Sequence, residues 1–273
     1  MSDNDDVPFN RNFPLQSGVV DEVRPTVRRI LCNNPGPFTF TGTVSYIVGR
    51  GKVAIIDPGP DDPAHSAALL DAVRGETVTH IFVTHTHRDH SMNTASIKAA
   101  TGATVYAEGP HRASRPRFES EKHNPESGAD RDFRPDALVR DGAVIEGDGW
   151  SLEAVTTPGH TANHLAFAWK ERGMTFVGDH VMGWSTSIVA PPDGSMVDYM
   201  ASLEKLTARD EDLYFSGHGP EIAEGPRYVR FLIRHRHARE ASILHRLAKG
   251  EADIPSIVRA QPMSLSPARR ATG

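Results

Sequence analysis

The sequence has almost no cysteine: Cys32 is the single one among 273 residues. This excludes an internal disulfide framework and a zinc finger built from cysteines, and it is typical of a reducing compartment. No apolar run approaches the ~20 residues of a membrane span. The acidic start, MSDNDDVPFN, lacks the charged and apolar segments of a secretion signal. We therefore expect a cytoplasmic protein that binds no membrane.

An excess of positive charge is also missing, because 30 lysines and arginines are outnumbered by 35 aspartates and glutamates and the formal net charge is -5. The chain as a whole has no attraction for phosphate or anionic lipid, so binding of a nucleic acid would need a local basic patch. The remaining composition, 38% hydrophobic and 24% charged, is that of a globular protein with a sizeable core. We expect one large domain with a small appendage.

The pattern of apolar residues predicts a polar lead-in, several short strands and then an alternation of helices and strands. Helices are expected at 64–73 and 198–209, with a long one at 226–249, and Ser91 is expected to cap a helix that Gly102 closes. A stretch poor in apolar residues predicts a long surface insertion of the kind that forms lids or substrate walls, at 109–136. The order fits neither a strictly alternating sheet nor a pure sandwich, so we expect two packed sheets with helices outside.

Four potential metal ligands directly follow a predicted buried strand. In the stretch HTHRDH, His85 and His87 alternate, and Asp89 and His90 come next. Side chains two apart at a strand end point to one side, so the alternating histidines can reach one ion, while the turn lets the other pair reach a second. A solvated loop rich in histidine is the alternative, but four donors without spacers favour a metal site.

Three later predicted strands each end in a glycine followed by another donor. These donors are His160 in TTPGHT, Asp179 in FVGDH and His218 in FSGHGP. Delivery of side chains from the ends of buried strands is how a rigid scaffold builds a site from distant parts of a chain. His164 and His180 lie close to this set in the sequence and either support it or serve packing.

With this ligand pattern, the chain resembles the metallo-beta-lactamase superfamily from about Arg24 to Gly250. The resemblance implies an α/β protein with the metallo-beta-lactamase fold, an αββα sandwich of two mixed β-sheets flanked by helices. Asp57 in IIDPG stands where the family carries an aspartate near the ligands, the alternative being a turn former. Carried over by motif, the first metal is held by His85, His87 and His160, the second by Asp89, His90 and His218, and Asp179 bridges the two.

Seven mixed nitrogen and oxygen donors exceed what a closed structural zinc site needs, and this surplus indicates catalysis. Two divalent ions roughly 3.5–4 Å apart would share a hydroxide that attacks an electrophilic carbonyl or phosphorus. Zinc is the first expectation, and iron or manganese would also suit the oxygen-bearing second site. Asp89, which can orient the nucleophile, and His87 are the predicted catalytic residues. No nucleophile elbow is present, so we expect no covalent route.

Within the superfamily, the chain is most similar to the beta-lactamase-like protein 2 group, related to single-strand-specific endoribonucleases. The likeness lies in THTHRDHS, in GDHVMGWSTSIVAPPDGSMVDYMASLEKL, in SGHGP and in IRHRHAREASIL. It implies a phosphodiester, RNA-like substrate, either a small molecule or single-stranded RNA. Arginines of the last long helix would track phosphates, and Trp184 or Tyr199 would stack a base; a solvated helix face and core packing are the alternatives.

Three other functions stay open. A thioester hydrolase of the glyoxalase II type shares the ligand set, although Ser91, Met92 and Asn93 stand where such enzymes have a glycine-containing stretch. The others are a β-lactamase and an inactive metal-binding scaffold. The resemblance divides the chain into a metallo-beta-lactamase-like domain, 1–225, and a basic helix with a shortened winged-helix-like tail, 226–273.

Overall fold

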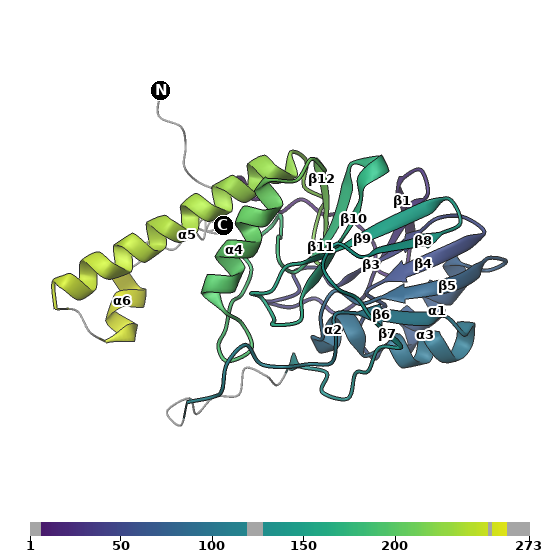
Figure 1. The fold of residues 1–273 in the computed structure, drawn as a ribbon, viewed down its shortest axis with the longest axis horizontal. Coiled ribbons are helices and arrows are strands. Elements are labelled where there is room, and N and C mark those ends of the chain that lie inside the picture. The colour runs from purple at the N-terminus through teal and green to yellow at the C-terminus, as the bar shows by residue number, and fades with distance from the viewer. Residues whose placement is uncertain (1–6, 119–127, 251–252, 261–273) are drawn as a thin grey trace, which may run out of the picture. The chain divides into compact units, whose positions relative to one another are not determined.

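Two β-sheets pack face to face, and helices cover their outer faces (Figure 1). The computed structural model describes residues 7–118, 128–250 and 253–260. Within these ranges, the larger sheet has seven strands in the order β1-β2-β3-β4-β5-β6-β7, and the smaller has five in the order β12-β11-β10-β9-β8. Both sheets contain parallel and antiparallel pairs. The predicted αββα fold class is therefore confirmed.

The strands of the larger sheet are β1 (Val20–Arg24), β2 (Val27–Leu31), β3 (Val44–Val48), β4 (Lys52–Ile56), β5 (Thr77–Phe82), β6 (Thr104–Ala107) and β7 (Ala137–Leu138). Those of the smaller sheet are β8 (Val144–Gly147), β9 (Trp150–Thr156), β10 (Leu165–Trp169), β11 (Met174–Gly178) and β12 (Leu213–Ser216). The helices are α1 (Pro63–Ala72), α2 (Arg88–Ser91), α3 (Thr94–Thr101), α4 (Met196–Thr207), α5 (Gly225–Ala248) and α6 (Ile254–Ala260). In the described ranges, every helix is too short or too polar to cross a membrane.

Alternation along the central strands buries both faces of the larger sheet. On β3, Tyr46 and Val48 pack into the core between the sheets, while Ile47 packs into the core on the outer side. On β4, Ile56 and Ile55 divide in the same way. Successive side chains of a strand point to opposite faces, so a continuous apolar run fits a strand that is covered on both sides. Burial on both faces therefore holds the ends of these strands rigidly.

Aromatic side chains join the two sheets. The ring centroids of Phe82 and Phe167 lie 4.8 Å apart, and Tyr46 meets Phe176 edge-on at 5.2 Å. The buried hydroxyl of Tyr46 donates a hydrogen bond to the carbonyl oxygen of Ser216 at 2.7 Å. A buried tyrosine hydroxyl needs such a partner, and here the partner ends β12, so the bond fixes β12 against β3.

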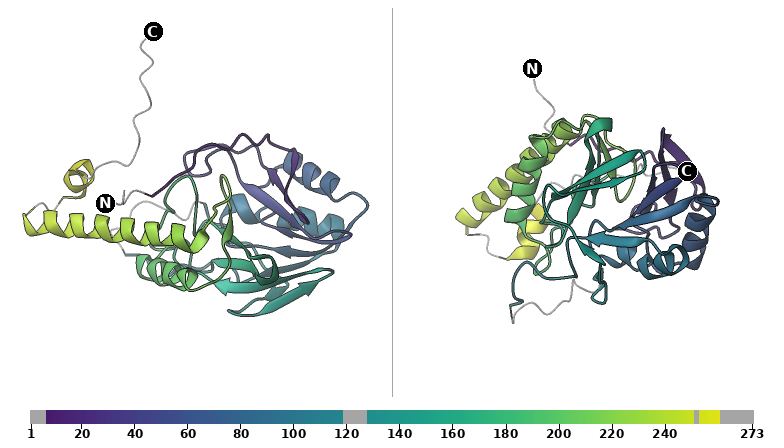
Figure 2. Two further views of the ribbon diagram at one scale, coloured as in Figure 1. Left: turned by 90° about the horizontal axis from the view of Figure 1, so that it is seen from above. Right: turned by 45° about the vertical axis from the view of Figure 1, so that its right-hand side comes forward.

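Helices α1 and α3 lie along the outer face of the larger sheet, and α4 lies along the smaller one (Figure 2). The Asp62 side chain caps α1 by accepting hydrogen bonds from the backbone N–H groups of Ala64 and His65. The Ser195 side chain caps α4 by accepting a hydrogen bond from the backbone N–H of Asp198. Such side-chain caps satisfy donors that a helix start leaves free. The helix predicted at 64–73 is confirmed by α1.

Ser91 does not cap a helix, so that prediction is wrong. It is the last residue of α2, and its hydroxyl donates to the carboxylate of Asp130 at 2.8 Å. The cap position of α3 is occupied by Asn93, and Gly102 ends this helix in the left-handed conformation, as expected. Directly after His87 the chain forms the additional short helix α2.

The polar lead-in also contains a strand, β1, that the sequence did not indicate. It pairs with β2 at the edge of the larger sheet, and none of its side chains is fully buried. An edge strand with exposed residues carries a weak apolar pattern.

The predicted insertion rejoins the body of the protein beside the histidine-rich stretch. Ala129 forms an isolated β-bridge with His87, and the Asp130 N–H donates to the carbonyl oxygen of Thr86 at 2.8 Å. Phe133, only 6% exposed, packs into the outer core of the larger sheet. The stretch 119–127 lies outside the described residues. The insertion is therefore anchored to the body of the protein at Ala129, Asp130 and Phe133 and is not a surface loop throughout.

The described residues form two compact units, one within 8–230 and one made of Val7 with 231–250 and 253–260. The first contains both sheets, α1 to α4 and the start of α5. The second contains the rest of α5 and α6. All seven predicted ligands belong to the first unit.

Candidate metal centre

The seven predicted ligands come together where four strands end. The stretch after β5 supplies His85, His87, Asp89 and His90, and the chain after β9, β11 and β12 supplies His160, Asp179 and His218. They form two groups, in each of which the ligand atoms lie within 4.8 Å of one another. The first half of the cluster is His85, His87, His160 and Asp179; the second half is Asp89, His90 and His218.

The first half directs three ring nitrogens toward one point. The Nδ1 atom of His87 lies 3.1 Å from Nε2 of His85 and 2.9 Å from Nε2 of His160. The Oδ2 atom of Asp179 lies 3.6 Å from Nε2 of His160. Three imidazoles around an open position are a common catalytic metal site.

The second half mixes imidazole and carboxylate. The Nε2 atoms of His90 and His218 are 3.3 Å apart, and Oδ2 of Asp89 lies 3.4 Å from the first and 3.3 Å from the second. Asp179 also reaches this half, since Oδ1 is 3.5 Å from Nε2 of His90 and Oδ2 is 3.2 Å from Nε2 of His218. One carboxylate therefore faces both halves.

The outward ring nitrogens of four ligand histidines each meet an oxygen atom. The pairs are His85 Nδ1 with Thr84 Oγ1 at 3.0 Å, His90 Nδ1 with Asp57 Oδ2 at 2.9 Å, His160 Nδ1 with Ile188 O at 2.6 Å and His218 Nδ1 with Gly42 O at 3.1 Å. A hydrogen bond on the outer nitrogen fixes the ring and leaves the inner lone pair for a metal.

Asp57 supports the second half from behind. Its Oδ1 accepts the Thr84 N–H at 2.7 Å, and its Oδ2 accepts the Thr84 hydroxyl at 2.7 Å and lies 2.9 Å from Nδ1 of His90. The residue has a φ of 50°, a conformation that costs free energy outside glycine and that persists only where the surroundings hold it. Asp57 therefore positions His90 and is more than a turn former.

Burial keeps two histidines of the first half, His85 and His160, neutral. It lowers the pKa of His85 well below the usual value, with a further contribution from His90 and the other nearby histidines. Burial likewise lowers the pKa of His160 to about 4. Metal-binding histidines must be unprotonated, so these rings are ready to donate.

Carboxylates dominate the second half. Burial opposes the charged form of His90, but Asp89, Asp179 and Asp57 together raise the pKa of His90 well above its usual value. For His218 the same opposition is overcome chiefly by Asp179, which raises the pKa of His218 to about 9. The buried carboxylates thus favour positive charge at this place.

The surroundings of Asp179 fit a bound cation. Its Oδ1 is buried and makes no hydrogen bond to any described residue. Gly217 lies against it, since a Cβ there would stand 2.4 Å from Oδ1 of Asp179 and 2.7 Å from Cε1 of His90. An unsatisfied buried carboxylate oxygen is costly, and a divalent metal held by this His/Asp cluster would satisfy it.

A cavity of about 440 Å³ opens onto the cluster. Of the seven ligands, His87 and Asp89 are the most open, with side chains 24% and 26% exposed. The wall beyond the ligands is largely apolar, being formed by Phe38, Thr39, Gly128, Met182, Ile188, Ala190 and Asp193. No lysine or arginine is among the described residues that line it.

The two aromatic residues expected to stack a base do not line this cavity. Tyr199 is fully buried, and its hydroxyl donates to the carbonyl oxygen of His180 at 3.2 Å, so its predicted role is wrong. Trp184 stacks on Phe40 with ring centroids 4.8 Å apart. Tyr199 thus serves packing, the alternative that the sequence had left, whereas Trp184 is half-buried and its role in stacking a base stays a prediction.

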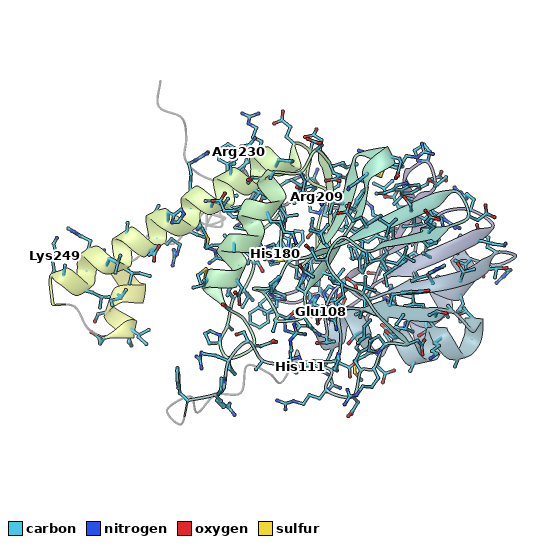
Figure 3. The ribbon with its side chains drawn as sticks, in the orientation of Figure 1. Glu108, His111, His180, Arg209, Arg230 and Lys249 are labelled. Atoms are coloured by element: carbon cyan, nitrogen blue, oxygen red, sulfur yellow. The ribbon has the colours of Figure 1, made fainter. Side chains whose placement is uncertain are left out.

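His164 and His180 are buried beside the cluster. The His164 ring stacks on His85 with centroids 5.2 Å apart, and its Nδ1 lies 2.8 Å from the Thr157 hydroxyl. His180 follows β11 (Figure 3), and its ring packs on Tyr199 at 4.6 Å. Neither belongs to the two ligand groups found among the described residues. Sequence reasoning missed Asp193: it lies within the stretch GDHVMGWSTSIVAPPDGSMVDYMASLEKL, but no strand end or histidine next to it marks it as part of the site.

Comparison with known proteins agrees with this geometry. The family model described as Metallo-beta-lactamase superfamily matches residues 38–218. The chain is 31% identical over 236 residues to the Beta-lactamase-like protein 2 homolog of Caenorhabditis elegans, covering 85% of the chain and 74% of that protein. It is 30% identical over 235 residues to the Atrochrysone carboxyl ACP thioesterase of Passalora fulva, covering 84% of the chain. The match spans 64% of that thioesterase, less than two thirds of its length.

The fold has counterparts among solved structures. A metallo-beta-lactamase family protein from Thermus thermophilus matches with a TM-score of 0.66 and 22% sequence identity, covering 82% of this chain and 83% of that one. This likeness concerns the fold alone. The family match, together with the sequence relatives, shows that the chain belongs to the metallo-beta-lactamase superfamily of hydrolases.

Proposed function

We propose that the protein is a hydrolase with two divalent metal ions that cleaves acyl thioesters. The first metal would be held by His85, His87 and His160, the second by Asp89, His90 and His218, and Asp179, which faces both halves, would bridge them. Zinc suits the nitrogen-rich first half, and iron or manganese would also suit the second. When bound, such ions acidify water toward a pKa of ~7 and stabilise negative charge on an attacked carbonyl group.

Asp89 is suited to orient the attacking water molecule. The hydroxyl of Thr43 donates to Oδ2 of Asp89 at 3.2 Å, and the same oxygen faces His90 and His218. The other carboxylate oxygen is left to accept a hydrogen bond from water in the cavity. Because a carboxylate can both bind and orient in this way, Asp89 and His87 remain the proposed catalytic residues.

The observation that carries the choice of substrate is the wall of the cavity. Phe38, Met182, Ile188 and Ala190 offer an apolar surface for an acyl chain. Outside the ligand set, Asp193 is the only titratable side chain among the described lining residues. A thiolate leaves without prior protonation more readily than an alkoxide or an amine, because a thiol has a pKa of about 8.5. Cleavage of a thioester therefore depends least on an acid that protonates the leaving group, and this cavity does not offer such an acid.

One relative supports the same reaction class. The Passalora fulva protein is named an acyl carrier protein thioesterase. We transfer the thioester class and not its particular acyl group, since the chain covers 64% of that protein.

A phosphodiester, RNA-like substrate is the second candidate. Its support is the basic residues of α5, of which Arg227 and Arg230 belong to the first unit, and the similarity to the Beta-lactamase-like protein 2 homolog. Arg227 is, however, paired with Glu224 at 2.6 Å. The wall of the cavity offers no basic side chain to hold a phosphate among its described residues, so the acyl substrate is favoured.

A substrate panel tests the proposal. The purified protein, loaded in turn with zinc, iron(II) and manganese(II), is assayed with acyl thioesters of N-acetylcysteamine of increasing acyl length, with bis-p-nitrophenyl phosphate and with a chromogenic cephalosporin. We expect kcat/KM for long apolar thioesters to exceed the other two by at least about 100-fold. The control is His87→Ala, which should be inactive on all three.

Two results would overturn it. Faster turnover of bis-p-nitrophenyl phosphate than of every thioester would transfer the assignment to a phosphodiesterase. Inactivity on the whole panel with each metal bound would support the inert scaffold instead.

A further inference from the structure

Asp193 is a buried carboxylate at the metal centre to which neither the ligand set nor the proposed reaction gives a role. It lies between β11 and α4, lines the cavity and is only 5% exposed. Its Oδ2 lies 3.5 Å from Nε2 of His87. Its Oδ1 is buried and makes no hydrogen bond to a described residue. No lysine or arginine in the described ranges pairs with it, and a buried unpaired carboxylate is costly.

The surrounding backbone holds Asp193 in this place. The N–H and the hydroxyl of Ser114 donate to the carbonyl oxygen of Pro192 at 2.9 and 2.8 Å, and the hydroxyl also reaches the carbonyl oxygen of Gly194 at 3.1 Å. A Cβ on Gly194 would stand 2.8 Å from the Ala190 nitrogen and 2.9 Å from the carbonyl oxygen of Gly159. The loop is therefore packed tightly on the turn that carries His160.

His87 is the exception among the ligand histidines. The other four present Nε2 to the cluster and hold Nδ1 against an oxygen atom at 2.6–3.1 Å. His87 presents Nδ1 to the cluster, so its Nε2 points outward, where Asp193 is the acidic group that the structure pairs with it. The neutral ring can bind a metal through Nδ1 only when its proton is on Nε2.

We infer that Asp193 positions His87 by accepting a hydrogen bond from its Nε2–H and so keeps the Nδ1 lone pair for the metal of the first half. This rests on the metal centre of the proposed function. Asp57 does the same for His90 in the second half, so each half would have one histidine backed by a carboxylate. A carboxylate partner also makes the imidazole a stronger electron donor.

Asp193→Asn tests this role through metal binding. Zinc affinity and stoichiometry are measured by competition with a chromogenic chelator, beside wild type and the control Asp148→Asn, an exposed aspartate outside the cluster. We expect one of the two sites to bind zinc about 10–100-fold more weakly in Asp193→Asn, while the other site and the control stay unchanged. With a thioester substrate at saturating zinc, kcat should fall and KM should stay constant.

A second measurement needs no variant. Long-range ¹H–¹⁵N NMR of the histidine rings in the zinc-loaded wild type reports which nitrogen of His87 carries the proton, and we expect Nε2. A proton on Nδ1 would overturn the inference even if Asp193→Asn does not fold.

The remaining outcomes separate this inference from the proposed function. Wild-type zinc affinity in Asp193→Asn together with a raised KM would mean that Asp193 contacts the substrate, which overturns the positioning role and leaves the hydrolase intact. Binding of a single ion by the wild type would overturn the two-metal hydrolase and leave the positioning role of Asp193, whereas binding of no ion would overturn both.

Discussion

The two halves of the ligand cluster share Asp179 but differ in charge. In the first half, burial holds the pKa values of His85 and His160 low, so that the rings are neutral. In the second half, carboxylates raise the pKa values of His90 and His218 despite burial. The first half therefore offers neutral imidazoles beside the shared carboxylate, and the second is an anionic pocket that attracts a cation. Two sites with different chemistry can arise a few ångströms apart because the carboxylates of Asp89 and Asp179 act most strongly on His90 and His218.

Removal of a first-half ligand should have the largest effect. In His87→Ala, we expect turnover to fall by several orders of magnitude while the protein stays folded, because the ion that would activate water loses one of its nitrogen donors. Activity, metal content and circular dichroism are measured together, with the exposed His245→Ala as the control. Near-normal turnover in His87→Ala would contradict the role of the first half in catalysis.

A change behind the second half should weaken that half selectively. In Asp57→Asn, an amide replaces a carboxylate that serves Thr84 and His90, so His90 loses the partner that keeps its proton on Nδ1. We expect metal affinity of one site to fall about 10–100-fold and the free energy of unfolding to fall by about 1–3 kcal/mol.

Chelator competition and urea denaturation measure these two quantities. If Asp57→Asn and Asp193→Asn weakened the same site, the division of the cluster into two separately supported halves would be wrong.

A buried histidine, His65, lies behind Asp57, which supports the second half. We expect His65 to affect how the stability of the protein depends on pH. The Ser45 hydroxyl donates to the carbonyl oxygen of Asp57 at 2.5 Å and lies 2.8 Å from Nε2 of His65. Burial lowers the pKa of His65 from 6.5 to about 4. Its contribution to stability is therefore fully present above pH 6.5 and is lost as the pH falls through about 4.

The size of this contribution is on the order of 3 kcal/mol. Urea denaturation between these pH values should show a shallower decline in His65→Gln than in wild type. Equal slopes would mean that His65 does not carry this part of the pH dependence.

Ionic strength should have the smallest effect. Neither half is flanked by lysine or arginine among the described residues of the cavity wall, so kcat/KM for a neutral thioester should change less than about twofold between about 50 and 200 mM salt. A steep fall with salt in the turnover of bis-p-nitrophenyl phosphate or single-stranded RNA, measured on the same preparation, would indicate phosphate contacts and favour the RNA-like substrate.

The ligands were open to prediction because each follows a buried strand or lies within one compact motif. The strands before the ligands end in buried apolar residues, such as Ile81 and Phe82 of β5 and Phe176 and Val177 of β11, and HTHRDH concentrates four donors in one place. The edge strand β1 was missed because its residues are not fully buried. Asp193 was missed for another reason: it lies in an irregular loop, and its contact with His87 depends on how two distant segments pack.

The measurement that tests the central claim most directly is the crystal structure of the zinc-loaded protein, with anomalous scattering to locate the metal and elemental analysis to count it. We predict two ions roughly 3.5–4 Å apart, one on each half of the cluster, with the Asp179 carboxylate bound to both. A single ion at full occupancy with excess zinc, or ions beyond coordinating distance of His87 and Asp89, would contradict the account.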